Sequence, residues 1–317
     1  MQVGLAFHPS FLKHDTGAGH PERMERVQAI IEHLRPMDLW EQLRHLEPPL
    51  ASPEVLHLVH PPRYIDKIEE ACRNGPSHLD PDTVASVGSW EAALRAVGAV
   101  TQGIDEVMQG SSKSVFCAVR PPGHHALANH AMGFCLFNNV AIGARYAERH
   151  HGLRRILIVD WDVHHGNGTQ AIFYNDPSVL YFSTHQAPFY PATGGREETG
   201  RGAGKGFTIN VPLSSGCGDR EIIAAFRKEL LPKAEAFKPE LILISAGFDA
   251  HRDDPLAGLV VTEEGFAALT RQVREIAEKF CAGRIVSVLE GGYHLQALGA
   301  SVEAHLRALM SHLGGET

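Results

Sequence analysis

The stretch from Ile156 to Gly168 reads ILIVDWDVHHGNG, an apolar run that ends in two acids and two histidines. Four consecutive apolar residues are typical of a strand covered on both faces, as in a parallel sheet flanked by helices. In open α/β sheets, ligands bind at the carboxyl ends of such strands. Asp160, Asp162 and His164 are spaced two apart, so on an extended chain they share one side. The stretch predicts a buried strand that ends in half of a metal site, although Asp or Asn before Gly is also ordinary turn or helix-cap chemistry.

Length and composition place the chain among large globular α/β proteins. It has 317 residues, of which 44% are hydrophobic and 21% are charged, so it can bury a substantial core. We expect one domain that spans residues 1–317. The net charge of −8 argues against a general nucleic-acid-binding protein and is compatible with cationic substrates.

Cysteine usage and the N-terminal residues indicate the compartment. The five cysteines are far apart and form no CxxC pair, which argues against a disulfide framework and against a thiolate zinc site. The first residues carry no basic segment followed by an apolar run, and no window reaches the ~18 apolar residues that a membrane span needs. We therefore expect a cytoplasmic protein that does not bind membranes.

From Ser114 onward, strand-like and helix-like patterns alternate, which is typical of a parallel sheet with covering helices. With two earlier runs, the pattern predicts an α/β fold with eight strands, mostly parallel. The expected strands are Gln2–Phe7, Arg44–Glu47, Val115–Val119, Ile156–Val159, Val179–Ser183, Phe207–Val211, Leu241–Ser245 and Ile285–Leu289. The expected helices are Pro21–Leu34, two short helices between Ser52 and Cys72, Trp90–Val107, Phe137–Arg149, Arg220–Phe237, Thr262–Phe280 and Leu295–Leu313. The loop Asn74–Thr83 is rich in turn residues, and the loop Gln186–Lys205 is long enough to form a functional rim.

Polar segments follow four of the expected strands. These segments are Arg120–His125, Asp160–His165, Ser245–Asp249 and Glu290–Tyr293. In a parallel sheet all four converge on one edge, where a catalytic site would be assembled. Taken singly, each has an ordinary structural interpretation: two exposed imidazoles in a stiff loop, a capping aspartate, or a packed tyrosine.

Asp162, His164 and Asp249 are the predicted metal ligands. Two carboxylates and one imidazole leave an open position on a tetrahedral metal, as a catalytic zinc requires. Such a metal lowers the pKa of bound water from 15.7 towards ~7 and polarises a carbonyl group. A nearby imidazole can transfer the proton, and a tyrosine hydroxyl can donate a hydrogen bond to the developing oxyanion. These parts predict metal-assisted amide hydrolysis, although an oxygen-rich ligand set also accepts iron(II) or cobalt.

Six motifs occur in a characteristic order along most of the chain. They are His20–Arg23, Arg120–His125, Gly133–Asn139, Asp160–Gly168, Ser245–Asp249 with Asp254–Leu256, and Leu289–Tyr293. In these motifs the sequence resembles the zinc-dependent histone deacetylases and their bacterial relatives, the histone deacetylase-like amidohydrolases and acetylpolyamine amidohydrolases. The resemblance implies the single-domain fold shared with arginases, an eight-stranded parallel sheet between helices.

The resemblance also implies roles for the catalytic side chains. The three predicted ligands match the family's zinc ligands. His125 matches the histidine taken as general base and acid, His124 matches its electrostatic partner, and Tyr293 matches the tyrosine that stabilises the transition state. Asp160 and Asn167 match the groups that support the histidine pair from behind and fix its tautomers.

Further sites are implied by the resemblance alone. The family binds a structural potassium ion near the zinc, and the matching residues here are Asp160, Asp162, His164, Ser183 and Thr184. The residues that match the tunnel for the acylated side chain are Gly133, Phe134, Tyr190 and Leu256.

A few positions indicate the subclass. Asn167, which replaces the aspartate of class I enzymes, and Phe248 make the chain similar to class II. Tyr293 is retained, unlike in weakly active class IIa enzymes. Tyr190 replaces the commoner phenylalanine and adds a hydroxyl group. Leu256 stands where the polyamine-specific class IIb enzyme has an acidic gatekeeper, which argues against a polyamine substrate.

Together these features predict a zinc-dependent amidohydrolase that removes an acetyl or other short acyl group from an N-acylated lysine or similar amine. One alternative is deacetylation of an acetylpolyamine or another small amide. A second alternative is a catalytically silent metal-binding protein. The sequence allows for a homo-oligomer and does not decide the physiological substrate.

Overall fold

The computed structural model describes residues 2–311, and their centre is one eight-stranded sheet. The strands are β1 (Val3–Ala6), β2 (Arg44–Leu46), β5 (Ser114–Cys117), β6 (Ile156–Asp160), β7 (Val179–Gln186), β8 (Thr208–Leu213), β9 (Leu241–Ala246) and β10 (Ile285–Leu289). Their order is β2-β1-β5-β10-β9-β6-β7-β8, and every neighbouring pair is parallel. The eight predicted strands and their parallel arrangement are confirmed, and β7 continues three residues beyond its predicted end.

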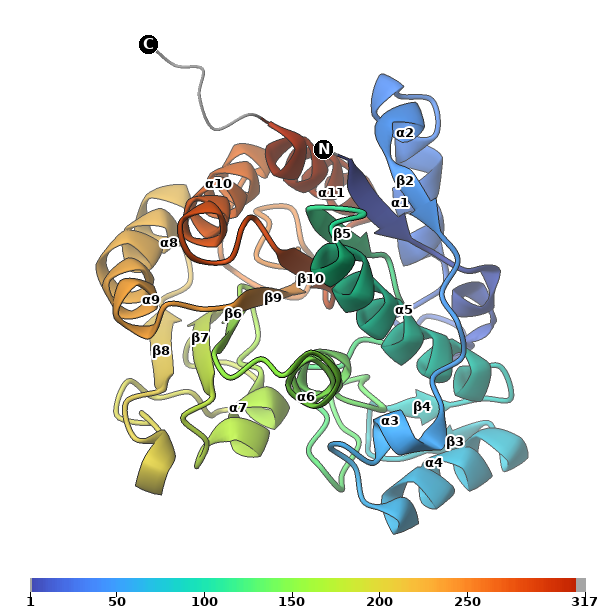
Figure 1. The fold of residues 1–317 in the computed structure, drawn as a ribbon. Coiled ribbons are helices and arrows are strands. Elements are labelled where there is room, and N and C mark those ends of the chain that lie inside the picture. The colour runs from blue at the N-terminus through green and yellow to red at the C-terminus, as the bar shows by residue number, and fades with distance from the viewer. Residues whose placement is uncertain (1, 312–317) are drawn as a thin grey trace.

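Helices cover both faces of the sheet (Figure 1). One face carries α1 (Glu25–Leu34), α8 (Asp219–Ala225), α9 (Leu231–Phe237), α10 (Glu263–Phe280) and α11 (Leu295–Met310). The other face carries α5 (Ser89–Gln109), α6 (Asn139–His151) and α7 (Asn167–Phe173). Short elements complete the described chain: η1 (Pro9–Lys13), α2 (Asp38–Gln42), α3 (Pro53–Leu56), α4 (Pro62–Asn74), β3 (Ser77–His78), β4 (Val84–Ala85), η2 (Gly202–Gly204) and a π-helical turn (Phe226–Leu230) between α8 and α9.

Several boundaries differ from the sequence-based expectation. Helix α1 begins at Glu25 and not at Pro21, because the side chain of Glu22 turns into the interior and its backbone N–H donates to His20 Nδ1 at 3.0 Å. The loop 74–83 contains β3, which pairs with β4 in antiparallel fashion. Helices α2 and α7 were not predicted. The expected end of the last helix at Leu313, like the ends of the 1–317 span, lies outside the described residues.

The core explains why the central strands are apolar along their whole length. All residues from Ile156 to Val159 are fully buried because helices pack on both faces of β6. Their side chains belong to one continuous cluster that includes residues from β9, β10 and the helices of both layers. Burial of this kind supplies most of the free energy that favours folding.

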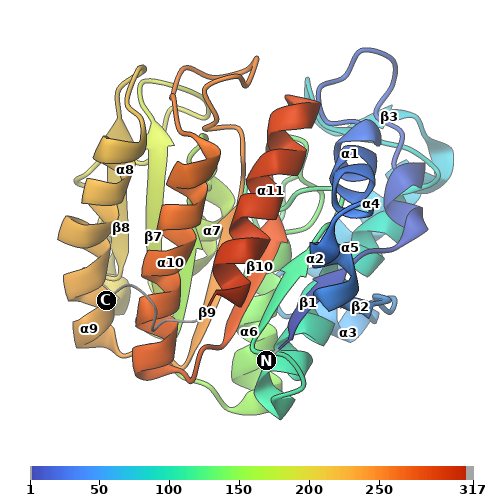
Figure 2. The same cartoon turned by 90° about the horizontal axis from the view of Figure 1, so that it is seen from above.

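The parallel arrangement places every strand's carboxyl end at one edge of the molecule. Figure 2 shows the strands from the side, with these ends and the long connecting loops at the upper edge. Strands β6 and β9 pair with Asp160 opposite Ser245, and β9 pairs with β10. The segments that follow β6, β9 and β10 therefore begin side by side. Among residues 2–311, no helix combines the length and apolar character needed to cross a bilayer.

Replacing Leu157 by alanine tests the core. Leu157 lies in β6 and is 0% exposed, so the change leaves a cavity and should lower the free energy of unfolding by about 2–5 kcal/mol. The matched control is Leu50→Ala, because Leu50 is 52% exposed and should cost less than about 0.5 kcal/mol. Urea unfolding of both variants measures the difference, and equal losses would contradict the assigned core.

Candidate active site

Three predicted metal ligands from two strand ends meet at the carboxyl edge of the sheet. Asp162 and His164 follow β6, and Asp249 follows the neighbouring strand β9. Their ligating atoms all lie within 4.8 Å of one another. His164 Nδ1 is 3.0 Å from Asp162 Oδ1 and 3.2 Å from Asp249 Oδ2. Within the described part of the chain, no other group of three such side chains was found.

The two carboxylates of this cluster are buried and carry like charges. Asp162 is 1% exposed and Asp249 is 0% exposed. Burial, followed by the charge of Asp162, raises the pKa of Asp249 to about 7. Asp249 Oδ2 is buried and accepts no hydrogen bond from any residue between 2 and 311. Two acids held together without water need a proton or a cation between them, so the residues present fit a divalent metal ion.

Backbone groups orient the carboxylates. Asp249 Oδ1 accepts a hydrogen bond from the Val163 backbone N–H at 2.8 Å, and Asp162 Oδ2 accepts one from the Gly291 N–H at 2.8 Å. A Cβ atom at Gly291 would overlap the Asp249 carboxylate, so only glycine allows this approach. The segment after β10 thereby packs directly against the metal-ligand cluster.

A histidine pair lies beside the cluster, with each ring held by a different acceptor. The ring centroids of His124 and His125 are 4.0 Å apart. His124 Nδ1 contacts Asp160 Oδ2 at 3.1 Å, and His125 Nδ1 contacts Asn167 Oδ1 at 2.7 Å. Because a carboxylate and an amide oxygen can only accept, both Nδ1 atoms carry hydrogen. In each ring, the other nitrogen, Nε2, takes no part in these contacts and is available for proton transfer.

The surroundings give the two histidines different charge states. Burial lowers the pKa of His124, but the carboxylates of Asp162 and Asp160 outweigh burial and raise it to about 10. For His125, burial and then the positive charges of His124 and His164 hold the pKa well below 6.5. At neutral pH, His124 is therefore a cation, and His125 is neutral with a free Nε2 that can accept a proton.

Tyr293 stands at the same edge, in the short connection between β10 and α11, which begins at Leu295. Arg26 donates from Nε to the Gly292 carbonyl at 2.6 Å and from Nη2 to the Glu290 carbonyl at 2.5 Å. The Arg26 guanidinium also lies 4.8 Å from the centre of the Tyr293 ring. Burial raises the pKa of Tyr293, so its hydroxyl group keeps its proton and can donate a hydrogen bond.

A cavity of about 260 Å³ opens onto these groups. It is lined by Asp82, Pro122, His124, His125, Gly133, Phe134, His164, Tyr190, Leu256, Gly291 and Tyr293. All four residues predicted for the tunnel are among them. The His125 ring centroid lies 5.2 Å from that of Tyr190, and the Phe134 centroid lies 6.0 Å from that of Tyr293. The cavity is therefore walled by aromatic rings, with the histidines and the metal-ligand cluster reached through it.

One wall of the cavity has an unusual backbone. Phe134 has a φ of +69°, which a phenylalanine rarely adopts, and its N–H donates to the Thr83 hydroxyl at 3.0 Å. The ring centroid of His20 lies 4.8 Å from that of Phe134. Gly133, with a φ of +56°, lies so close to the His125 ring that a Cβ would overlap it. These contacts hold Phe134 against the opening.

The residues predicted for potassium also lie together. Asp160 ends β6 and pairs with Ser183 of β7, and Thr184 follows. Asp160 Oδ1 accepts from the Asp162 N–H at 3.2 Å, while Oδ2 also accepts from the Tyr181 hydroxyl at 3.0 Å. The Thr184 hydroxyl is buried and has no hydrogen-bond partner within residues 2–311.

Sequence reasoning missed a buried charge network behind the site. Glu22 Oε1 accepts from Arg120 Nε at 2.5 Å and from Arg26 Nη1 at 3.0 Å, and all three side chains are 0% exposed. Burial raises the pKa of Glu22, but Arg120 and His14 outweigh burial and hold it well below 4.5. The signal was Arg26, a charged residue on the apolar face of its helix, one turn before Ile30.

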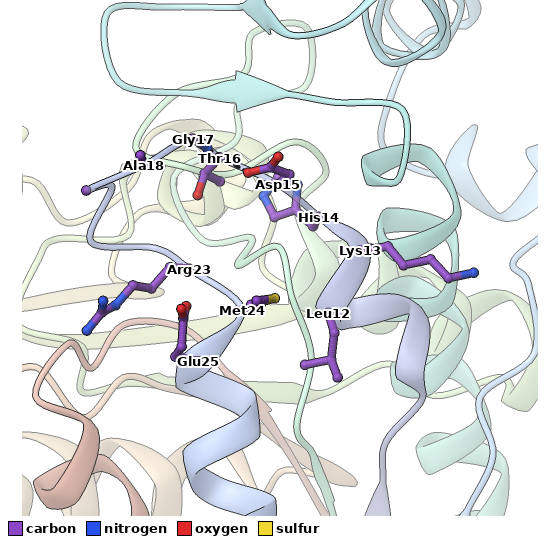
Figure 3. A pocket seen from close by; sticks show the side chains of 11 residues that line it. Leu12, Lys13, His14, Asp15, Thr16, Gly17, Ala18, Arg23, Met24 and Glu25 are labelled. Atoms are coloured by element: carbon purple, nitrogen blue, oxygen red, sulfur yellow. Dashed lines mark hydrogen bonds between the residues drawn. The ribbon is translucent and has the colours of Figure 1, made fainter.

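A second hollow, of about 600 Å³, is lined by residues from two nearby segments, 12–19 and 23–25. Figure 3 shows His14 and Asp15 on one side of it and Arg23, Met24 and Glu25 on the other. Its lining mixes bases and acids and contains no group of three metal ligands among the described residues. The catalytic features described above belong to the smaller cavity.

Comparisons with known proteins decide the family. A model of the histone deacetylase domain matches residues 20–309. The chain belongs to the histone deacetylase family. It is 42% identical over 298 residues to a probable deacetylase of Archaeoglobus fulgidus, covering 93% of this chain and 82% of the relative. It is 40% identical over 277 residues to the histone deacetylase-like amidohydrolase of Pseudomonas aeruginosa, covering 87% and 73%.

A human polyamine deacetylase is 43% identical over 305 residues, which cover 91% of this chain and 44% of that protein. The crystal structure of the HDA15 HD domain superposes with a TM-score of 0.93 at 39% identity, covering 98% of this chain and 89% of that one. These findings confirm the predicted family and fold. The chain is thus a hydrolase of the deacetylase and amidohydrolase type, from a family that is generally zinc-dependent.

Glu290 offers a test of the site's electrostatics. It accepts from the N–H groups of Gly123 and His124 at 2.6 and 3.1 Å and from the Ser245 hydroxyl at 3.0 Å. Burial raises its pKa from 4.5 to about 7. Between these values the folded chain keeps a proton that the unfolded chain releases, so the contribution of Glu290 to stability falls as the pH rises, by at most about 3 kcal/mol.

Glu290→Gln mimics the protonated acid at every pH. Urea unfolding of the two metal-free proteins at pH 5 and pH 7.5 should show the wild type losing stability relative to the variant at the higher pH. A stability difference that does not change with pH would contradict the raised pKa.

Proposed function

We propose that the chain is a zinc-dependent deacylase that removes an acetyl or other short acyl group from an N-acylated lysine or similar amine. The observation that carries the proposal is the buried cluster of Asp162, His164 and Asp249 beside two histidines, of which one is a cation and the other is neutral. A structural site would not need a neutral base with a free nitrogen facing a cavity. The arrangement supports hydrolysis of an amide.

Asp162, His164 and Asp249 would hold the zinc ion. The chemistry that zinc supplies when bound is Lewis acidity, which polarises an amide carbonyl and acidifies water. Because only three side chains would bind the metal, it would remain open to water or substrate. The carboxylate of Asp160, with the backbone carbonyls of Asp162, His164, Ser183 and Thr184, would hold the structural potassium ion that the family resemblance implies.

His125 is the proposed general base and acid. Its Nδ1–H is held by Asn167, so Nε2 accepts a proton from water and returns it to the leaving amine. The cation on His124 makes His125 a weaker base and stabilises negative charge that develops nearby. The different roles proposed for His124 and His125 follow from the different pKa values of their rings.

Tyr293 is the proposed hydrogen-bond donor to the oxyanion. Its hydroxyl keeps its proton because the side chain is buried, and it lines the same cavity as the histidines. The aromatic walls at Phe134 and Tyr190 would exclude water and contact the alkyl chain of an acylated lysine. Such a chain is long, thin and apolar up to its amide group, which matches an aromatic-walled cavity.

Zinc reconstitution tests the proposal. The metal-free protein should release no acetate from an acetyl-lysine peptide, and one equivalent of zinc should restore turnover. Tyr293→Phe should lower kcat about 10²- to 10³-fold, since it removes one oxyanion donor, while zinc content measured by mass spectrometry stays at one per chain.

Tyr146→Phe is the matched control. Tyr146 lies on α6, away from the cavity, and its hydroxyl contacts Asp105 on α5. This variant should retain wild-type kcat. Absence of turnover at full zinc occupancy would favour the catalytically silent metal-binding protein instead. Unchanged kcat in Tyr293→Phe would remove the role assigned to that hydroxyl.

A second candidate substrate is an acetylpolyamine. It is favoured by the similarity to the human polyamine deacetylase and by the carboxylate of Asp82 in the cavity lining. Leu256, which lines the same cavity, argues against it because it offers no charge to a distant ammonium group. We therefore propose that acetyl-lysine peptides are preferred over acetylspermidine.

Leu256→Glu tests this preference. A carboxylate at this position should attract the extra ammonium groups of acetylspermidine and raise its kcat/KM about tenfold or more relative to the wild type. Leu256→Gln, of the same shape but uncharged, is the control and should show no such gain. If the wild type already prefers acetylspermidine to peptides, the proposed substrate class is wrong.

A further inference from the structure

Asp254 connects two parts of the cavity wall through its carboxylate. It lies between β9 and α10, five residues after Asp249, and is 6% exposed. Oδ2 accepts hydrogen bonds from the backbone N–H groups of Tyr293 at 2.7 Å and His294 at 3.4 Å. Oδ1 accepts one from the Leu256 N–H at 3.0 Å.

The segment that Asp254 holds has little structure of its own. Residues 290–294 lie between the end of β10 and the start of α11. Gly292 has a φ of +123°, a conformation that side chains rarely allow. The position of the Tyr293 backbone therefore depends on contacts from other segments.

Two opposite charges supply those contacts. Arg26 donates to the carbonyl groups of Glu290 and Gly292, and Asp254 accepts from the N–H groups of Tyr293 and His294. The turn is thus held from its carbonyl side by a cation and from its amide side by an anion. Both oxygens of the buried Asp254 carboxylate accept hydrogen bonds from backbone N–H groups.

We propose that Asp254 is a positioning residue for the reaction, which sets the place of the Tyr293 hydroxyl and of the Leu256 wall relative to the metal-ligand cluster. The proposal rests on the role of Tyr293 given above. Because a displacement of about 1 Å at a reacting group can cost about 100-fold in rate, loss of these hydrogen bonds should appear in kcat. Zinc content should stay at one per chain, because the hydrogen bonds of Asp254 go to Leu256, Tyr293 and His294 and not to the three ligands.

Asp254→Asn is the first test. The amide keeps the shape of the side chain, but its NH₂ group cannot accept, so one of the two sets of backbone hydrogen bonds is lost. We expect kcat to fall about 10- to 100-fold at unchanged zinc content. Asp253→Asn is the matched control, because the neighbouring Asp253 side chain is 56% exposed, and it should retain wild-type kcat.

A double-mutant cycle with Tyr293→Phe separates positioning from a general structural effect. If Asp254 acts through the tyrosine hydroxyl, Asp254→Asn should lower kcat less than about twofold when that hydroxyl is already absent. The same fold-loss in both backgrounds would overturn the positioning role and leave the proposed function intact. Wild-type kcat in Tyr293→Phe alone would overturn the proposed role of the tyrosine, and the role of Asp254 with it.

Hydrogen–deuterium exchange gives a readout that needs no turnover. In the metal-free protein, the peptide containing Tyr293 and His294 or the peptide containing Leu256 should exchange faster in Asp254→Asn than in the wild type or Asp253→Asn. Unchanged protection of both peptides would overturn the proposal. Should Asp254→Asn fail to fold, Asp254→Glu replaces it, since it keeps both acceptor oxygens but moves them by one methylene. Wild-type kcat and exchange in that variant would assign Asp254 to folding alone.

Discussion

Burial of two like charges is the constraint around which the site is built. Asp162 and Asp249 lie side by side out of water, and such an arrangement is stable only when a proton, a cation or directed hydrogen bonds offset the repulsion. In each carboxylate, one oxygen accepts a hydrogen bond from a backbone N–H group, and the other oxygen faces His164. The parallel pairing of β6 with β9 makes this possible, because it starts both acidic segments at the same height on one edge.

The same charges set the chemistry of the neighbouring histidines. Asp160 and Asp162 keep His124 protonated, and the resulting cation lowers the proton affinity of His125. Asn167 contributes differently, because a neutral amide fixes the tautomer of His125 without adding a charge. Two adjacent residues of identical type thereby acquire different roles from their acceptors alone.

Loops without regular structure form much of the cavity wall. Buried charged side chains hold these loops in place of the backbone hydrogen bonds that helices and strands provide. Arg26, Glu22 and Arg120 connect the start of α1 to the segments after β5 and β10. Asp254 completes the support of the turn that carries Tyr293. A buried ion network of this kind contributes little net stability, but removing one partner leaves an uncompensated charge. Its value here lies in fixing the relative positions of side chains that come from distant parts of the chain.

The sequence by itself determined the sheet and the residues around the metal-ligand cluster. Apolar runs buried on both faces indicated the central strands, and the polar residues at their ends pointed to one edge, because strand burial and strand termination are local properties. The helix that begins at Asn167 shows the limit of local reasoning: the helix was not predicted, and the Asn167 side chain supports His125 across 42 positions of sequence. The tertiary structure alone decided the charges of the histidines, the burial of Glu22 with two arginines, and the attachment of Asp254 to the tyrosine turn. These depend on distances between segments that no local pattern encodes, since hydrogen bonds and pKa values respond to neighbours within a few ångströms in space.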